Sequence, residues 1–218
     1  MLREYDAPVY QRAKNHFKKA DPHLYKAAQD IEIEEITHST DLFRDIVWTI
    51  IGQQLSSRAA DAIFARFVSS FADGGITPER VLNLPDERMR GAGLSMAKVR
   101  AIRAFALAVE REELLLAKLF ASKDEEVVAE LTKVKGIGPW TAEMVLMFSL
   151  GRPDIFSRGD LGLRKGIMEL YGLRKPPSER RFRQLLEAWS PYRTYAARIL
   201  WKISDQKTKR VGRKRATK

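Results

Sequence analysis

The sequence of 218 residues contains no cysteine. This excludes disulfides, thiolate zinc sites and cysteine-bound iron–sulfur clusters. The three histidines, His16, His23 and His38, are scattered, which argues against a histidine metal site. No apolar run reaches the ~18 residues of a membrane span, and the N-terminal segment is too polar for a secretory signal. We therefore expect an intracellular protein with no membrane partner, in the cytoplasm and nucleoid or, in a eukaryote, the nucleus.

Alternating strand patterns of useful length are also missing. Instead, apolar residues recur with the i, i+3, i+4, i+7 spacing of amphipathic helices. Glycine and proline separate these periodic stretches. The pattern predicts an all-α protein of about ten helices. The clearest periodic stretches are residues 41–55, 58–71, 97–110, 161–171 and 179–203.

Positive charge is concentrated at the C-terminus. The segment 207–218 contains seven Lys or Arg and no acid, so the rest of the chain carries only +4 of the net +11. A run of this kind neutralises phosphates and favours nucleic acid. It is equally typical of a solvated terminus, while the absence of an apolar face argues against a membrane surface. We expect a disordered basic tail that is either solvated or an arm for nucleic acid.

The most informative stretch is residues 131–144, LTKVKGIGPWTAEM. Its pattern predicts a helix, a tight Gly-x-Gly turn and a second helix. Gly136 and Gly138 can adopt positive φ and permit close approach of another backbone, and Pro139 suits the first position of a helix. The start of that helix offers free N–H groups and a positive dipole end to an anion.

Two interpretations of this hairpin stay open. It can be a helix–turn–helix that only packs, or a turn that binds phosphate. Lys133 and Lys135 flank the turn and favour phosphate. Asp160 follows sixteen residues after the stretch ends and supplies one carboxylate. A phosphate-binding hairpin followed by a lone acid suggests an enzyme that acts on a nucleic acid.

The hairpin and the aspartate carry a family resemblance. VKGIGPWTAEM, followed by Asp160 in FSRGDLGLRKG, resembles the helix-hairpin-helix DNA glycosylases of the HhH-GPD superfamily. Three further stretches are similar to its AlkA-type 3-methyladenine glycosylase II branch. They are IIGQQLS at 50–56, GLSMAK at 93–98 and WSPYRTYAARILW at 189–201.

The resemblance implies a two-lobed helical fold with the active-site cleft between the lobes. One lobe would span 42–152 and contain the hairpin. The other would combine 1–41 with 153–206 and carry the aspartate, and 207–218 would be the tail. The chain looks like a compact form without the additional N-terminal α/β domain of a larger bacterial relative.

The resemblance also implies the chemistry. Bifunctional relatives have a lysine nucleophile where this chain has Trp140, and an indole cannot form the covalent intermediate. We therefore expect a monofunctional glycosylase without abasic-site lyase activity. Asp160 would be the catalytic residue, stabilising the positive charge that develops on the sugar and orienting water. Taken alone, an Asp before an apolar helix is an N-cap. Relatives often have a second Asp where this chain has Gly159.

The target base must leave the duplex to reach the acid. Trp140, Trp201 and Met144 would form the base pocket, since indoles stack well on a cationic base. The alternative for both tryptophans is ordinary core packing. Met144 stands where the bacterial relative has a tyrosine, so the pocket is expected to be less aromatic.

Several residues would contact DNA. By the resemblance, Gln54 fills the gap left by the flipped base, with Gln53 beside it. The alternative is that both glutamines cap a helix end. Met96 would touch the groove. The hairpin would hold the backbone through Lys133, Lys135, Gly136 and Gly138.

No organic cofactor is expected. Hairpins of the resembling family can hold a monovalent cation, Na⁺ or K⁺, through backbone carbonyls, which here would be those of Thr132, Val134 and Ile137. The expected partner is double-stranded DNA with alkylated bases, bound by a monomer. The expected reaction is excision of 3-methyladenine and 7-methylguanine in base-excision repair. A glycosylase for deaminated, oxidised or mismatched bases and a non-catalytic DNA-damage binder are the alternatives.

Overall fold

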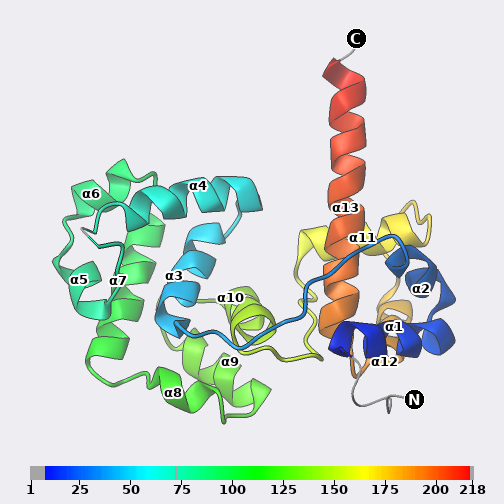
Figure 1. The fold of residues 1–218 in the computed structure, drawn as a ribbon, viewed down its shortest axis with the longest axis horizontal. Helices are drawn as coiled ribbons and strands as arrows, with labels where there is room; N and C mark the ends of the chain where they lie inside the picture. The colour runs from blue at the N-terminus through cyan, green and yellow to red at the C-terminus, as the bar shows by residue number, and fades with distance from the viewer. Residues whose placement is uncertain (1–7, 72, 217–218) are drawn as a thin grey trace. The chain divides into compact units, whose positions relative to one another are not determined.

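A computed structural model of the chain describes residues 8–71 and 73–216 and, beyond Gln206, only the course of the backbone. Within these residues all regular structure is helical (Figure 1), which confirms the predicted all-α class. None of the helices in this part of the chain has both the length and the apolar character that crossing a membrane requires. The chain forms two compact units. The hairpin unit is Thr37–Gly151, and the aspartate unit combines Met1–Ile36 with Arg152–Lys218.

Short helices build the hairpin unit around α3. Asp41 begins α3 by accepting the N–H of Arg44, and Ser56 and Ser95 cap α4 and α7 in the same way. The α3 helix packs against α4, α7 and α10, and Phe43 stacks on Phe105 of α7 with ring centroids 5.0 Å apart. The bounds are α3 Leu42–Gly52, α4 Ser57–Val68, α5 Pro78–Asn83, α6 Asp86–Gly91, α7 Met96–Glu110, α8 Leu116–Leu119, α9 Asp124–Thr132, α10 Pro139–Met144 and the π-helical turn η2 Val145–Ser149.

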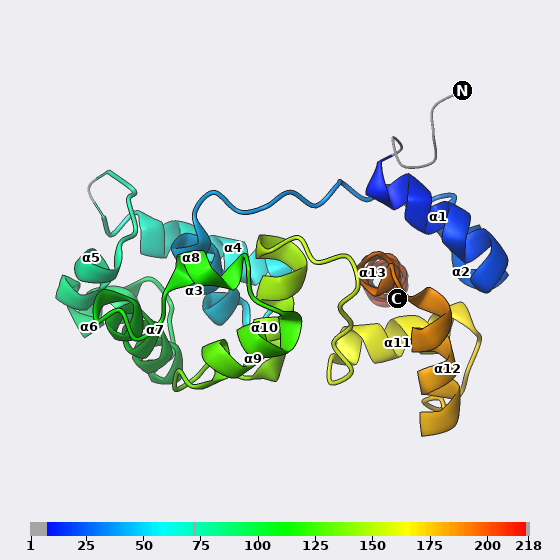
Figure 2. The same ribbon diagram turned by 90° about the horizontal axis from the view of Figure 1, so that it is seen from below.

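The aspartate unit is arranged around α13. The α2, α11 and α12 helices pack against it (Figure 2). The buried carboxylate of Asp21 caps α2 and accepts hydrogen bonds from Tyr171 Oη and, at 2.8 Å, from Trp189 Nε1. This carboxylate therefore joins the N-terminal helices to the C-terminal ones. The bounds are α1 Val9–Ala20, α2 Pro22–Ala28, α11 Leu161–Leu170, α12 Glu179–Trp189 and α13 Arg193–Ala216.

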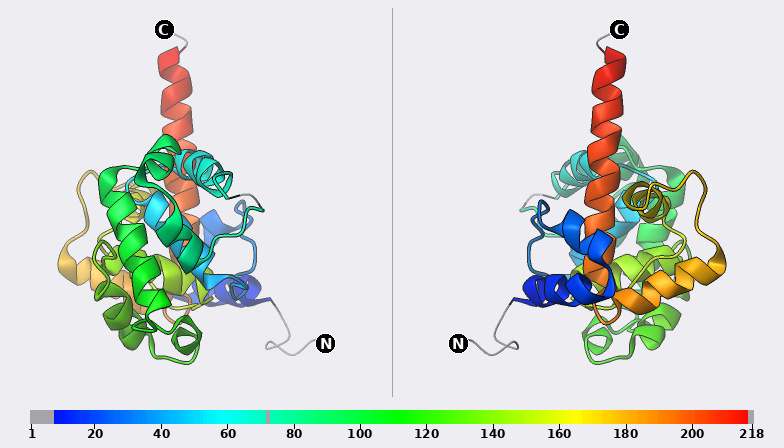
Figure 3. Two further views of the ribbon diagram at one scale, coloured as in Figure 1. Left: turned by 90° about the vertical axis from the view of Figure 1, so that its left-hand side faces the viewer. Right: turned by 90° about the vertical axis from the view of Figure 1, so that its right-hand side faces the viewer.

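The C-terminal segment differs from its prediction. The sequence predicted a disordered tail from Lys207, whereas the described backbone stays helical to Ala216. Figure 3 shows this end of α13 extending beyond the other helices of the aspartate unit. Lys and Arg are good helix formers, and no proline interrupts the segment after Pro191. Residues 217 and 218 lie outside the described part.

Candidate functional site

The hairpin consists of α9, a turn at residues 133–138 and α10. Gly136 has φ +95°, and a Cβ at this position would lie 2.4 Å from Ala101 Cβ in α7. Only glycine fits there, because both the backbone conformation and the packing on α7 exclude a side chain. Gly138 instead has φ −100°, and an added Cβ would meet no atom within 4 Å. Of the two glycines, only Gly136 uses the left-handed region.

Local sequence sets the start of α10. Gly138 is the N-cap and offers no side-chain cap, and Pro139 follows at the first helical position. The turn is closed by a hydrogen bond from Ile137 N–H to the Val134 carbonyl, 3.0 Å long. Lys133 and Lys135 are both exposed. Lys133 Nζ lies 2.6 Å from Glu130 Oε1 in an exposed ion pair, which a phosphate can displace at little cost.

The two glutamines after α3 have different environments. Gln53 is the C-cap of α3, which confirms that it ends a helix, and its Nε2 donates to the Gly136 carbonyl and to Thr141 Oγ1, both at 3.0 Å. Gln54 is exposed and adopts φ +59°, a conformation that is uncommon for a residue with a side chain. The structure thus directs Gln53 towards the hairpin and leaves Gln54 at the surface.

The start of α7 lies close to the end of α3. Lys98 Nζ donates to the Ile51 carbonyl at 2.7 Å, and burial lowers the pKa of Lys98. A cation at a helix C-terminus is favoured by the helix dipole. Met96, predicted to touch DNA, is half-buried as the first residue of α7. No signal in the sequence indicated the role of Lys98, since its partner is a carbonyl 47 residues away.

Two predicted pocket residues belong to α10. Trp140 is half-buried in its first turn, and Met144 is buried at its end. Because they are four residues apart in a helix, their side chains share a face. The half-buried state of Trp140 differs from that of a fully buried core tryptophan such as Trp189.

Asp160 lies at the start of α11 in the aspartate unit. It is the N-cap, and its Oδ1 accepts the Leu163 N–H at 2.8 Å. The same oxygen accepts the indole N–H of Trp201 at 3.0 Å. The predicted N-cap is therefore confirmed. The two donors fix the orientation of a carboxylate that keeps partial exposure to solvent.

Two glycines of α11 leave the space that the contact between Asp160 and Trp201 needs. A Cβ at Gly162 would lie 3.0 Å from Trp201 Cδ1 and 3.1 Å from Asp160 Oδ1. A Cβ at Gly166 would lie 2.5 Å from the Leu200 carbonyl oxygen. Glycine at both positions lets α11 approach α13 closely enough to bring the indole to the carboxylate. The sequence reasoning missed both residues, although their i, i+4 spacing on one helix face was a usable signal.

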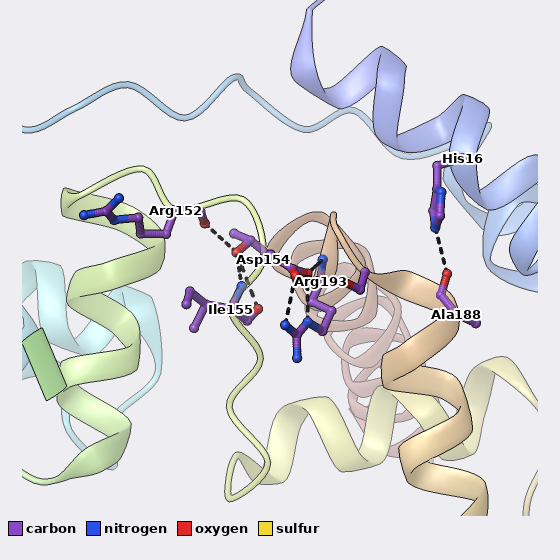
Figure 4. Close-up of polar contacts among 8 residues, drawn as sticks. His16, Arg152, Asp154, Ile155, Ala188 and Arg193 are labelled. Atoms are coloured by element: carbon purple, nitrogen blue, oxygen red, sulfur yellow. Dashed lines mark hydrogen bonds and ion pairs between the residues drawn. The ribbon is translucent and has the colours of Figure 1, made fainter. Parts of the chain in front are cut away.

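The loop before Asp160 is anchored to the first turn of α13 (Figure 4). Asp154 and Arg193 form a two-pronged ion pair with distances of 2.7 and 2.8 Å. The buried Thr194 donates from Oγ1 to the Arg152 carbonyl at 2.6 Å and accepts the Ile155 N–H at 3.0 Å. One helix, α13, thus holds the beginning of the loop through its first turn and the end of the loop through Trp201.

The Asp154–Arg193 pair makes this anchor pH-dependent. Burial alone would raise the pKa of Asp154, but hydrogen bonds from Arg193 and Ser190 outweigh it and hold the pKa below its ordinary value. Because the folded-state pKa is lower than the unfolded one, the pair contributes its full stability above about pH 4. That contribution is lost as the pH falls through the folded-state pKa.

The arrangement around Asp160 is suited to electrostatic and proton-transfer chemistry. A carboxylate held by two N–H donors can stabilise a nearby developing cation, and it can orient a water molecule and accept its proton. Within residues 8–71 and 73–216, no group of three His, Cys, Asp or Glu side chains could hold a metal ion.

A helical hairpin unit joined to a second helical unit with an aspartate on an anchored loop defines the helix-hairpin-helix class of DNA-binding enzymes. Residues 47–191 match the HhH-GPD superfamily of base excision DNA repair proteins. The chain belongs to this superfamily.

Known relatives agree with this assignment. DNA-3-methyladenine glycosylase 1 of Schizosaccharomyces pombe is 36% identical over 170 residues, which are 74% of this chain and 72% of the relative. The structure of an S. pombe 3-methyladenine DNA glycosylase in complex with abasic DNA has a TM-score of 0.79 at 32% identity and covers 88% of this chain and 95% of that one. The DNA-3-methyladenine glycosidase of Bacillus halodurans has a TM-score of 0.74 at 35% identity, with 91% and 90% coverage.

Proposed function

We propose that this protein is a monofunctional DNA glycosylase that flips out and excises alkylated purines such as 3-methyladenine and 7-methylguanine. It hydrolyses the N-glycosidic bond, leaves an abasic site and so begins base-excision repair. The observation that carries the proposal is Asp160, a partly exposed carboxylate oriented by Leu163 N–H and Trp201 Nε1. The names of the similar proteins support the same substrate class.

In the proposed mechanism Asp160 acts on the sugar. As the bond between C1′ and the base breaks, positive charge develops on the deoxyribose, and the carboxylate stabilises it. A water molecule oriented by the same carboxylate attacks C1′ and gives up its proton to that carboxylate, while the electrons of the broken bond leave with the purine. An alkylated purine is already cationic and leaves without much assistance, so one acid suffices. Trp140 carries no amine, and Lys135 lies on the other side of the two turn glycines from α10. Water is therefore the nucleophile, and the strand stays intact.

The roles of the pocket and DNA-contact residues belong to the same proposal. Trp140 and Met144, on one face of α10, line the pocket for the extruded base. The Trp140 indole stacks on the cationic ring of that base. Gln54 enters the gap in the duplex, Met96 contacts the groove, and the hairpin binds the DNA backbone. The backbone contacts at the hairpin are assigned to Gly136, Gly138, Lys133 and Lys135.

A monovalent cation at the hairpin also belongs to the proposal. The Val134 carbonyl accepts one hydrogen bond, from Ile137 N–H. A carbonyl oxygen has two lone pairs, so Val134 keeps one for a cation, alongside the carbonyls of Thr132 and Ile137. Such an ion would add positive charge next to a bound phosphate. We assign no organic cofactor to the protein and expect it to act as a monomer on double-stranded DNA.

The proposal is tested by incubating the protein with duplex DNA treated with a methylating agent. We expect free 3-methyladenine and 7-methylguanine in the supernatant. The DNA strand should remain intact until alkali cleaves the abasic sites. Duplexes with a single uracil, 8-oxoguanine or mismatch serve as parallel substrates.

Each other outcome of this assay contradicts one part of the proposal. Release of only a deaminated, oxidised or mismatched base would show that the protein acts on that class of base and not on alkylated purines. Tight binding of methylated or abasic DNA without any release would identify a damage-binding protein. Strand cleavage before alkali would contradict the argument from Trp140.

The hydrogen bond from Trp201 gives a separate prediction. Trp201→Phe keeps an aromatic ring but removes the donor to Asp160 Oδ1. A hydrogen bond to a charged group is worth about 1.5–3 kcal/mol, so we expect single-turnover base release to slow by about tenfold or more, with little change in DNA affinity.

A matched control for Trp201→Phe exists in the hairpin unit. Trp48 Nε1 donates to Asp61 Oδ1 at 3.1 Å on the surface, so Trp48→Phe removes the same kind of bond elsewhere. We expect the control to release base at the wild-type rate. Equal rates for the Trp201→Phe variant and the wild type would show that the indole N–H does not position the carboxylate.

A further inference from the structure

The side-chain amide of Gln53 is fully engaged within the hairpin unit. A carboxamide nitrogen has two hydrogens, and Nε2 directs one to the Gly136 carbonyl and the other to Thr141 Oγ1. One acceptor lies in the turn itself, and the other lies in the first turn of α10. Gln53 therefore clamps the turn and the start of α10 to the end of α3, which leaves no amide donor to read a base.

Gln54 follows directly and is held in an uncommon backbone conformation. Its φ of +59° is left-handed, and its side chain is exposed. A non-glycine residue stays in this region only when its surroundings impose it. Here the surroundings do so from several directions. Lys98 holds the Ile51 carbonyl, Gln53 holds the hairpin, and Leu55 N–H bonds the Gly52 carbonyl at 3.0 Å.

We infer that Gln53 is a positioning residue that couples the hairpin to Gln54, so that binding of the hairpin to the DNA backbone presents Gln54 to the duplex in one fixed geometry. The inference rests on the proposed function for the roles of the hairpin and of Gln54. The adjacent glutamines then have different roles, because Gln54 meets the DNA and Gln53 sets where Gln54 stands. Lys98 supports the same loop from α7.

The coupling predicts a specific energetic pattern. Without the clamp, the loop at 53–55 can relax, and Gln54 must be ordered again each time it enters the duplex. Loss of Gln53 and loss of Gln54 should therefore remove the same contribution to lesion binding. Residues that act on DNA independently would instead contribute separately, and their effects would add.

A double-mutant cycle tests this pattern. The variants are Gln53→Met, which keeps length but has no donor, Gln54→Ala, and the double variant. The probe is the affinity of each protein for a duplex with a single abasic site and for the same duplex undamaged. A 2-aminopurine opposite the abasic site reports insertion through its fluorescence.

We expect each single variant to bind the abasic duplex about tenfold more weakly, with undamaged DNA nearly unaffected. The double variant should be no worse than Gln54→Ala. Thr141→Val, which removes one acceptor of the clamp, should reproduce part of the Gln53→Met loss and add nothing to it. The 2-aminopurine signal should fall in all of these variants.

Three results would overturn the inference. Additive losses would mean that Gln53 contacts DNA by itself, and an unchanged Gln53→Met would mean that the clamp is irrelevant to lesion binding. An equal loss on damaged and undamaged DNA would mean that Gln53 only stabilises the hairpin. The readout is DNA binding, so this test is independent of the proposed reaction. If the protein releases base but the losses of the two glutamines add, only the coupling is rejected. If the losses do not add but no base is released, only the proposed catalysis is rejected.

Discussion

Asp160→Asn is expected to reduce base release from methylated DNA by about 10²–10⁴-fold, the range in which a positioned acid or base contributes. Asparagine has nearly the same shape and is an equally good N-cap, so the α11 start is expected to keep its hydrogen bond from Leu163 N–H. What is lost is the negative charge beside C1′ and the ability to accept a proton. Single-turnover release of 3-methyladenine, measured with enzyme in excess, isolates this step from product release.

Asp41→Asn is the matched control for Asp160→Asn. Asp41 is also an N-cap, and it accepts the Arg44 N–H at 3.0 Å at the start of α3. The same substitution there removes a charge from a helix start without touching the proposed catalytic loop, so release should continue at the wild-type rate. The Asp160→Asn protein should still bind abasic DNA, because its hairpin unit is unchanged. An Asp160→Asn protein that releases base at the wild-type rate would show that Asp160 has no part in the mechanism.

The sequence predicted those features that local chemistry determines. Helical periodicity and the Gly-Ile-Gly-Pro turn were enough to place the hairpin, because helix starts and tight turns depend on a few adjacent residues. The resemblance pointed to Asp160, and the pattern before an apolar helix independently indicated the N-cap that the structure shows. Gln53 ends α3, as the alternative interpretation of the two glutamines held, and their predicted contacts with DNA stay predictions.

Features that depend on packing between distant segments were not predictable in this way. Trp201 and Asp160 are 41 residues apart, and their contact exists only because Gly162 and Gly166 allow α11 to lie close to α13. Likewise, the hydrogen bond from Gln53 to the hairpin could not be predicted, because it joins residues 83 positions apart. The roles of the predicted pocket and DNA-contact residues, and the cleft between the lobes, stay predictions for the experiments above.

The close approach of α11 to α13 leads to a prediction about the stability of the folded protein. Gly166→Ala places a Cβ 2.5 Å from the Leu200 carbonyl oxygen, closer than real Cβ atoms come to a neighbouring backbone. In an isolated helix the substitution would stabilise by about 1 kcal/mol through higher helix propensity. Overpacking of a well-packed contact costs about 1–3 kcal/mol, and here the obstacle is backbone, which cannot rotate away. We therefore expect net destabilisation of the aspartate unit, seen as faster amide hydrogen exchange in α11 and α13.

Gly91→Ala separates helix propensity from packing in the Gly166→Ala experiment. Gly91 is the last residue of α6, and an added Cβ there meets no atom within 4 Å. This control should be neutral or slightly stabilising, because only the gain in propensity remains. Separation of the helices at Gly166 should also move the Trp201 indole from Asp160 and slow base release beyond what the loss of folded protein explains. A Gly166→Ala protein as stable and as active as the wild type would show that α11 and α13 tolerate separation, and that glycine at 166 does not set the contact between Trp201 and Asp160.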